Sequence, residues 1–429
     1  MSVSKIWNTL FLEARPSIGL SFFRIFVALT TGLHVIPSFF HLDDNYFSTA
    51  FKLVNENFFT PEILALVGQS SDALVVFLVG IFVISWFSFL IGLYSQISCI
   101  VMTACCYYFY ALNDFHIGTL SWDILLVTLF LMCVTPYHGD YFSVDALRKK
   151  NVLAFKQTRP FFLQRLLQLQ IASTYFFTAL CKISSYGNWL TGNPIYYLMN
   201  YPPQGVTKNF LIKEWMATQP TFCYWMGIFI LSMELMLPFL LFNPKTRRSA
   251  IVMGFVFHIV LILTLDVPAI FLFLFPAQML LFIHPQKIMD WINRQRALNA
   301  LSPRYKIVYD GQCPFCLRSI EQLKVMDLFD RCEYVDYHSV ANLQLLHPAL
   351  NPQAAAAQMH LLTPNGKIYG GFFAFRQLGW IMPMLSPMLL VMYLPLMDWI
   401  GSIKYRFIAQ NRYRLNFNNK CEDNRCHKP

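Results

Sequence analysis

The chain has 429 residues, of which 56% are hydrophobic and 13% are charged, and its net charge is +10. Soluble domains contain about 45–50% apolar and about 25% charged residues, so this composition excludes an ordinary soluble enzyme and predicts that most of the chain lies in lipid. The positive charge does not predict nucleic-acid binding, because the basic residues are confined to a few loops, as they are in membrane proteins.

Apolar stretches long enough to cross a bilayer recur along the first two-thirds of the chain. A helix needs about 17–25 residues to cross about 30 Å of hydrocarbon. Such stretches lie near 20–40, 73–93, 95–112, 119–136, 161–182, 221–242, 249–265 and 267–284. We therefore expect residues 1–285 to form an α-helical polytopic membrane bundle of about eight transmembrane helices.

The charges of the loops predict the orientation of this bundle. The loop after the first stretch is acidic, with Asp43, Asp44, Glu56, Glu62 and Asp72. Basic residues follow the fourth, sixth and eighth stretches, namely Arg148, Lys149, Lys150, Lys156 and Arg159, then Lys245, Arg247 and Arg248, then Lys287, Arg294 and Arg296. Because basic loops stay in the cytoplasm, we expect both termini there, in a bacterial inner membrane.

Five ionisable side chains interrupt the apolar stretches: Arg24, Asp123, Lys182, Glu234 and His258. Since a charge is costly inside a bilayer, each is a candidate for a functional site in the membrane. The alternative is that these residues pair across the bundle for stability. Lys182 also has a chemical role open to it, because a lysine in apolar surroundings can lose its proton and act as a base.

A more polar part follows the last apolar stretch. Residues 286–303 are basic, and we expect a linker or a surface helix. From 304 to 416, strand patterns at 305–309, 333–337, 359–362 and 367–370 alternate with helical patterns. This order predicts an α/β domain with a thioredoxin-like fold, followed by a tail over 417–429.

Residues 380–400 are apolar enough to suggest a ninth span. Pro383, Pro387, Pro395 and Asp398 interrupt them, and an odd number of spans would move the basic C-terminal segment outside. We therefore expect a broken helical segment that forms a lid or docks on the bilayer.

Two cysteines stand where a predicted strand passes into a predicted helix. The strand ends in an Asp310-Gly311 turn, and Cys313 and Cys316 follow at once. The partial positive charge of a helix N-terminus favours thiolate over thiol, so Cys313 is the candidate nucleophile. One helical turn further on, Cys316 can attack a mixed disulfide formed at Cys313.

Zinc binding is the alternative reading of this pair, because Cys-x-x-Cys is also a zinc-ligand spacing. The remaining ligands would come from Cys421 and Cys426 in the tail. A purely structural disulfide is disfavoured in the cytoplasm. We therefore favour redox chemistry and expect no metal.

The other cysteines are expected to be packing residues. We expect Cys332, next to the predicted strand at 333–337, to be a buried strand residue. Six more lie in or beside the apolar stretches, where a cysteine behaves as a small hydrophobic side chain: Cys99, Cys105, Cys106, Cys133, Cys181 and Cys223.

The C-terminal part resembles the DCC family of thiol-disulfide oxidoreductases. The resemblance rests on Tyr309-Asp310-Gly311-x-Cys313-Pro314-Phe315-Cys316, Pro364-Asn365-Gly366-Lys367-Ile368-Tyr369-x-Gly371 and Tyr405-x-x-Ile408-Ala409-x-Asn411-Arg412-Tyr413. It implies a thioredoxin-like domain whose physiological substrate is poorly defined, and we expect its partner to be a thiol or disulfide protein or a small thiol. The chain departs from thioredoxins at Gln358-Met359, where their cis-proline would fall.

The membrane part resembles the HTTM domains, which share a membrane domain with vitamin K-dependent γ-glutamyl carboxylase. The resemblance rests on Phe23-Arg24, Leu90-Ile91-Gly92-Leu93-Tyr94-x-x-Ile97-Ser98-Cys99, Tyr141 to Leu147, Tyr175 to Lys182 with Trp189, Glu234, and Phe257-His258. It implies that Lys182 matches the carboxylase base, and that a quinone or vitamin K-like lipid is the candidate ligand. Trp122-Asp123 stands where the carboxylase has a functional histidine, so we do not expect carboxylase activity.

Three hypotheses follow. The favoured one is a membrane-anchored thiol-disulfide oxidoreductase with Cys313, Cys316, Asp310 and Gly311 at its active site. The second couples this dithiol to a quinone held in the membrane domain. The third is a membrane scaffold without enzyme activity.

Overall fold

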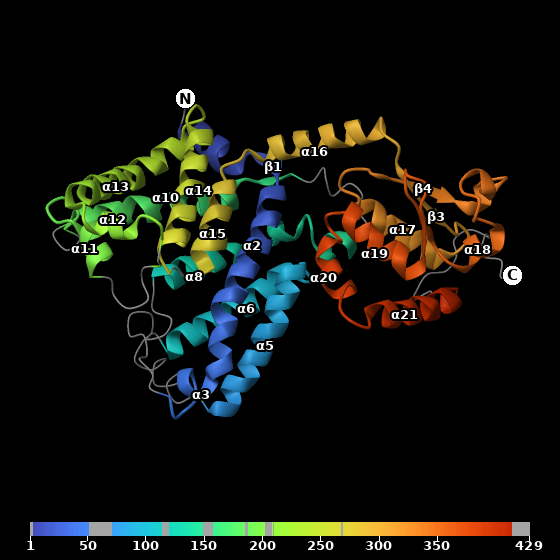
Figure 1. Cartoon of the computed structure of the whole chain (residues 1–429), viewed down its shortest axis with the longest axis horizontal. Coiled ribbons are helices and arrows are strands. Elements are labelled where there is room, and N and C mark those ends of the chain that lie inside the picture. The colour runs from blue at the N-terminus through green and yellow to red at the C-terminus, as the bar shows by residue number, and fades with distance from the viewer. Residues whose placement is uncertain are drawn as a thin grey trace. The chain divides into compact units, whose positions relative to one another are not determined.

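The computed structural model describes residues 3–50, 71–113, 120–148, 158–184, 188–201, 208, 210–266 and 269–413. The chain divides into two compact units, one made of Met1–Asp145 and Lys156–Gln286, the other of Ala146–Phe155 and Lys287–Pro429 (Figure 1). Each unit has a hydrophobic core of its own.

Helices make up nearly all of the first unit, and strands β1 and β2 pair in a short antiparallel ribbon. Its elements, with α9 at the border of the units, are α1 (Val3–Trp7), η1 (Asn8–Leu12), β1 (Ala14–Pro16), α2 (Ile18–Val35), η2 (Ile36–His41), α3 (Leu42–Asn45), α5 (Asp72–Ile91), α6 (Ser95–Leu112), α8 (Leu120–Cys133), η3 (Pro136–Gly139), α9 (Val144–Arg148), β2 (Thr158–Pro160), α10 (Phe162–Ile183), α11 (Pro194–Asn200), α12 (Lys213–Ala217), α13 (Pro220–Phe242), α14 (Arg247–Thr264) and α15 (Ala269–Leu280).

Within the described residues, five helical stretches are long and apolar enough to cross a membrane. They are Ile18–Asn45, Asp72–Ile91, Ser95–Leu112, Pro220–Phe242 and Arg247–Thr264, and each coincides with a predicted span. The predicted count of about eight is not confirmed, because α8 and α15 have only 14 and 12 described residues and α10 is too polar.

Two polar side chains of helix α10 form hydrogen bonds inside the bundle. Gln164 and Gln168 are buried, and their amides donate to the carbonyl of Leu281 over 2.6 and 2.8 Å. A buried amide of this kind is stable because it is hydrogen-bonded. Hydropathy alone therefore underestimates how well α10 fits among apolar helices.

Arg24 lies at a junction where three parts of the first unit meet. Its side chain is fully buried and donates to the carbonyls of Phe89, at the end of α5, and Phe142 over 3.3 and 2.5 Å. A cation at a helix C-terminus is favoured by the exposed carbonyls there. Gly92 ends α5 with a φ of +69°, and a Cβ at this position would lie 1.7 Å from Nη1 of Arg24.

The same junction also begins helix α6. The carboxylate of Asp145 accepts from the backbone N–H groups of Tyr94 and Ser95 over 2.8 and 2.7 Å. These are donors that the start of a helix leaves without intrahelical partners. Three of the segments on which the family resemblance rests therefore meet here.

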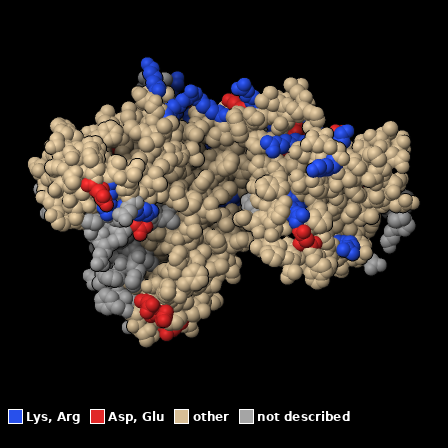
Figure 2. All heavy atoms as spheres, in the orientation of Figure 1, with Lys and Arg blue, Asp and Glu red and all other residues tan. Residues whose placement is uncertain are grey.

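The two ends of the helical bundle differ in charge. Arg15, Arg165 and Arg247 lie close enough at one end to repel one another. Asp43 and Asp44 lie in α3 at the other end. Figure 2 shows basic side chains near the N-terminal end of the bundle and acidic ones at α3.

The second unit contains a four-stranded mixed sheet with helices on both faces. Its elements are α16 (Pro285–Ala300), β3 (Tyr305–Tyr309), α17 (Pro314–Met326), β4 (Cys332–Asp336), η5 (Tyr337–Ser339), η6 (Leu343–Leu345), α18 (Pro352–Ala357), β5 (His360–Leu362), β6 (Ile368–Gly370), α19 (Gly371–Ile381), η7 (Ser386–Met388), α20 (Leu389–Met392) and α21 (Met397–Asn411). The predicted strands and the helix after the cysteine pair are confirmed to within two residues.

Strand β3 lies inside the sheet, whose order is β4-β3-β5-β6. It pairs in parallel with β4 and antiparallel with β5. Ile307 packs with residues of α17 and α19, and the next residue, Val308, packs with residues of η6 and α18 on the other face. Burial of both faces explains the continuous apolar run of this strand.

Residues 380–400 form no continuous helix, as expected, but pass from α19 through η7 and α20 into α21. Several apolar side chains are exposed there, including Trp380, Leu390, Leu396 and Trp399. Docking of this surface on the bilayer stays a prediction.

The junction at Arg24 generates a test of the membrane unit. Gly92→Ala places alanine in a left-handed backbone conformation, which costs about 1–2 kcal/mol. Its methyl group would also clash with Arg24. We expect a lower thermal unfolding temperature in detergent.

Gly80→Ala is the matched control, because Gly80 lies within α5 and has open space around the added Cβ. This change should leave the unfolding temperature equal or higher, since alanine favours a helix by about 1 kcal/mol over glycine. Equal stability of the two variants would contradict the described junction.

Candidate functional site

The cysteine pair follows strand β3 and lies at the start of helix α17. Strand β3 ends at Tyr309, and Cys313 is the N-cap of α17, with Pro314 at the first helical position. The Sγ of Cys313 accepts from the backbone N–H of Cys316 over 3.3 Å. The helix start therefore directs a hydrogen-bond donor at one sulfur, as the sequence predicts.

The turn before the cysteines is fixed by an aspartate on the neighbouring strand. The N–H of Gly311 donates to Oδ1 of Asp336 over 3.0 Å. A Cβ on Gly311 would lie 2.1 Å from Oδ2 of the same carboxylate. Glycine is needed here because the backbone approaches Asp336 too closely for a side chain.

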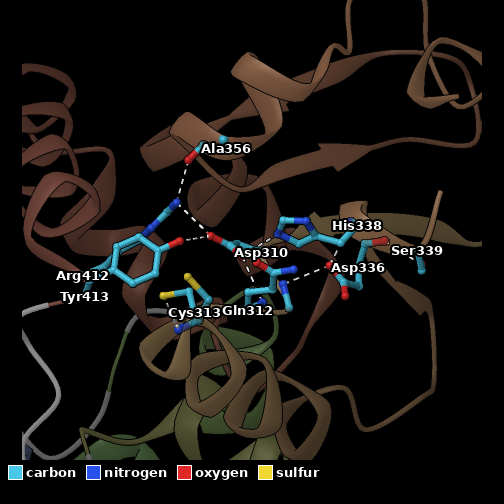
Figure 3. Close-up of polar contacts among 11 residues, drawn as sticks. Asp310, Gln312, Cys313, Asp336, His338, Ser339, Ala356, Arg412 and Tyr413 are labelled. Atoms are coloured by element: carbon cyan, nitrogen blue, oxygen red, sulfur yellow. Dashed lines mark hydrogen bonds and ion pairs between the residues drawn. The ribbon is translucent and has the colours of Figure 1, made fainter. Parts of the chain in front are cut away.

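Asp310 makes polar contacts with four residues of the site (Figure 3). Its side chain is 1% exposed. Oδ2 accepts from Nη2 of Arg412 and the hydroxyl of Tyr413 over 3.0 and 2.7 Å. Oδ1 accepts from the N–H of Gln312 over 3.0 Å and lies 3.1 Å from Nε2 of His338.

These contacts keep Asp310 ionised. Burial opposes the charge, but the hydrogen bonds from Tyr413, Gln312 and His338 and the positive charge of Arg412 outweigh it and lower the pKa of the carboxyl. Arg412 is in turn held by the carbonyl of Ala356, which accepts from Nη2 over 2.6 Å. The loop before the cysteines is thus tied to the end of the domain.

The two sulfurs have different proton affinities. The hydrogen bond from the Cys316 side chain has the largest effect on the pKa of Cys313 and lowers it. The N–H of Cys316 and the charge of Arg412 lower it further, whereas burial and the charge of Asp310 raise it. The result is a pKa of about 7 for Cys313. The same thiol–thiolate contact, with burial, raises the pKa of Cys316 above its ordinary value. Cys313 is therefore the thiolate of the pair, and Cys316 keeps its proton.

A small cavity of about 170 Å³ opens beside Cys316. Apolar side chains form most of its wall, including Phe315, Phe375 and Ile408, and Arg412 and Asp310 are at its edge. Cys313 itself is fully buried. The hydroxyl of Tyr405, from α21, accepts from the N–H of Met359 over 3.1 Å, so this backbone position opposite the cysteines is already occupied.

A second candidate site lies in the helical bundle. A cavity of about 470 Å³ is lined mainly by apolar side chains of α10, α11, α13, α14 and α15. Nζ of Lys182 lies 2.5 Å from each carboxylate oxygen of Glu234 and 4.8 Å from the ring centre of Trp189. The ion pair and the cation–π contact offset the cost of holding charge in this place.

A tyrosine–histidine pair forms another part of the same wall. The hydroxyl of Tyr175 is hydrogen-bonded to Nε2 of His258, and the His258 ring stacks on Phe275 with 5.0 Å between centroids. Polar groups that converge in a mostly apolar cavity are the usual features of a small-molecule site.

Comparison with sequence families decides the assignment. A model of the HTTM domain matches residues 14–291. The chain belongs to the HTTM domain family. A second model, DCC1-like thiol-disulfide oxidoreductase, matches residues 307–418. No curated protein matches the chain, and no solved structure does.

The HTTM match, with the apolar helices, identifies a membrane protein, and the DCC1-like match indicates oxidoreductase activity. Of the five ionisable residues chosen from the sequence, Lys182, Glu234 and His258 line one cavity of the HTTM domain. Arg24 and Asp123 do not line it. Asp123 accepts from the hydroxyl of Tyr110 over 2.6 Å, and Arg24 donates to the backbone carbonyls of Phe89 and Phe142.

Sequence reasoning missed several residues of both sites. Arg412 and Tyr413 belong to a segment that resembles the DCC family, but nothing in the sequence shows that they reach Asp310. His338, Tyr175 and Trp189 were likewise not chosen as site residues.

The zinc alternative stays a prediction, because Cys421 and Cys426 lie outside the described residues. Within the described part of the chain, no group of three or more potential metal ligands occurs. Cys332 is buried in β4, and its N–H donates to Asp327 over 2.8 Å, so its predicted place in a strand is confirmed.

The asymmetry of the cysteine pair can be measured by alkylation. The rate at which iodoacetamide modifies Cys313 should rise with pH, with a midpoint near 7, because its pKa is lowered to about 7. Cys316→Ala removes the side-chain donor that contributes most to this shift, so the midpoint should move upward. A midpoint near 9 in the unmodified protein would contradict the described hydrogen bonds.

Proposed function

We propose that the protein is a membrane-anchored thiol-disulfide oxidoreductase in which Cys313 attacks and Cys316 resolves. The observation that carries this proposal is the position of Cys313 at the start of α17, where its Sγ accepts from the backbone N–H of Cys316 over 3.3 Å. The directions of the pKa shifts agree with it, lowered at Cys313 and raised at Cys316. A dithiol of this kind has one sulfur ready to react and one that holds its proton until needed.

The reaction proceeds in two exchanges. The Cys313 thiolate attacks a substrate disulfide, forms a mixed disulfide and releases one substrate thiolate. Cys316 then gives up its proton and attacks Sγ of Cys313, so that the second substrate sulfur leaves as a thiol. Two electrons and the Cys316 proton pass to the substrate, the first thiolate released takes a proton from water, and the protein is left with a Cys313–Cys316 disulfide.

Access to Cys313 requires a movement of the covering chain, because this residue is fully buried. Ile408 and Arg412, at the end of α21, line the cavity beside Cys316 together with Met359. Displacement of this end of α21 would open a path for a protein disulfide or a small disulfide.

The fold supports a thioredoxin-like assignment as part of this proposal. In the sheet, β3 and β4 are parallel, whereas β5 and β6 run antiparallel to their neighbours. A dithiol at the start of the helix that links two parallel strands is the arrangement that the thioredoxin-like reading expects.

The membrane topology is also a proposal. Eight spans, with α8, α10 and α15 completing the five described ones, would leave both termini in the cytoplasm of a bacterial inner membrane. The basic cluster of Arg15, Arg165 and Arg247 supports this orientation, because basic ends stay inside.

The proposed activity predicts reduction of disulfides by the full-length protein. In detergent with dithiothreitol, it should accelerate the reduction of insulin or glutathione disulfide, and Cys313→Ser should reduce that acceleration by at least about 100-fold, because the thiolate is the nucleophile. Cys316→Ser should instead accumulate a mixed disulfide at Cys313.

Cys181→Ser is the matched control, since Cys181 is an exposed cysteine of the membrane unit and should not affect the rate. Full activity in the Cys313→Ser variant would exclude the proposed mechanism.

A second candidate function is favoured by the cavity at Lys182. Its apolar walls, the Trp189 and Phe275 rings, and the hydroxyl and imidazole of Tyr175 and His258 fit a quinone or vitamin K-like lipid, whose ring is flat and carries two acceptor oxygens. When bound, such a group would supply a two-electron, two-proton acceptor. Oxidation of the Cys313–Cys316 dithiol releases two electrons and two protons.

The residues of the cavity would then bind and orient the ring. Lys182 would donate a hydrogen bond to an acceptor oxygen, and Glu234 holds the ammonium in place through both carboxylate oxygens. The Tyr175–His258 pair would provide a second polar contact across the cavity.

Ligand binding to this cavity can be measured through the fluorescence of Trp189. A short-chain ubiquinone or menadione should quench it, and Lys182→Ala should weaken binding about tenfold, as expected for loss of about 1.4 kcal/mol. In liposomes, the same variant should slow quinone-dependent oxidation of the dithiol.

Asp123→Asn is the control, because Asp123 is also an ionisable residue of the membrane unit but does not line the cavity. Equal quinone binding by wild type and Lys182→Ala would rule out this candidate.

A further inference from the structure

A second pair of cysteines lies inside the HTTM domain. Cys99 is in the second turn of α6, and Cys133 is the last residue of α8. Their sulfurs are 3.7 Å apart. The sequence predicted two unrelated packing residues, and their meeting follows only from the pairing of α6 with α8.

Two further contacts help to position Cys99 and Cys133. The amide of Gln96 donates to the carbonyl of Cys133 over 3.3 Å, which ties the start of α6 to the end of α8. The Sγ of Cys133 also lies 3.4 Å from the hydroxyl of Thr103. The two sulfurs are already in contact, and formation of a disulfide would bring them to about 2.05 Å.

The two sulfurs differ in access. Cys99 is fully buried, whereas Cys133 is half-buried and is followed by Val134, which is 56% exposed. Pro136 begins η3 just beyond it, so Cys133 is at the end of its helix. A reagent can therefore reach Cys133 before it reaches Cys99.

We infer that Cys99 and Cys133 form a second redox-active thiol pair, which small disulfides such as glutathione disulfide oxidise to an intramembrane disulfide. Cys133 loses its proton and attacks the small disulfide, which gives a mixed disulfide and releases one small thiol. Cys99 then loses its proton and attacks Sγ of Cys133, which releases the second small thiol. The pair loses two electrons and two protons, and the small disulfide gains them.

This disulfide would join α6 and α8 at one end. It closes a loop of chain between residues 34 positions apart, so the oxidised protein should unfold at a higher temperature than the reduced one. The inference is independent of the activity proposed for Cys313 and Cys316.

The test uses the full-length protein in native membranes, incubated with glutathione and glutathione disulfide at increasing ratios. Remaining thiols are blocked with N-ethylmaleimide, and linked peptides are identified by mass spectrometry. We expect a Cys99–Cys133 linked peptide that increases with the proportion of glutathione disulfide. Recovery of both cysteines as N-ethylmaleimide adducts at every ratio would overturn the inference.

Two variants give a readout that does not depend on the linked peptide. In Cys99→Ala the resolving thiol is absent, so a glutathione adduct should persist on Cys133 at about tenfold or more above the wild-type level. Cys223→Ser is the control, because Cys223 is buried in a separate cluster, and it should show the wild-type pattern. An equal adduct on Cys133 with and without Cys99 would also overturn the inference.

Discussion

The C-terminal domain depends on one buried carboxylate. Asp310 is 1% exposed and is surrounded by donors from its own loop, from the segment after β4 and from the residues after α21. A buried charge is tolerated only when it is fully paired, so these segments must meet in one arrangement. Contacts from three segments therefore fix the turn before Cys313. The positive charge of Arg412 lowers the pKa of both Asp310 and Cys313.

The HTTM domain meets the same constraint in another way. Arg24 binds the carbonyls of two neighbouring segments, Asp145 begins α6, and Lys182 pairs with Glu234. Each of these groups has a partner distant in sequence, and such contacts hold apolar helices in a specific arrangement when lipid offers no hydrophobic drive between them. These contacts differ in their surroundings, because the Lys182–Glu234 pair lines a cavity of about 470 Å³.

Much of this could be predicted from the sequence where the signal is local. The strand of residues 305–309, the turn at Gly311 and the helix after Cys313 follow from neighbouring residues, and family resemblance found both domains. Contacts between distant segments could not be predicted, since nothing local shows that Arg412 reaches Asp310 or that Cys99 touches Cys133. The span at α10 was predicted from length, but Gln164 and Gln168 lower its hydropathy because they bind Leu281 inside the bundle.

The distance in sequence between Asp310 and Arg412 has a consequence for synthesis of the chain. They are 102 residues apart, so at about 5–20 residues per second the arginine leaves the ribosome roughly 5–20 s after the aspartate. During that interval Asp310 lacks its contacts with Arg412 and Tyr413. The positive charge of Arg412, which lowers the pKa of Cys313, is also missing. The nascent chain therefore carries Cys313 without the charge of Arg412, which arrives only with the segment after α21.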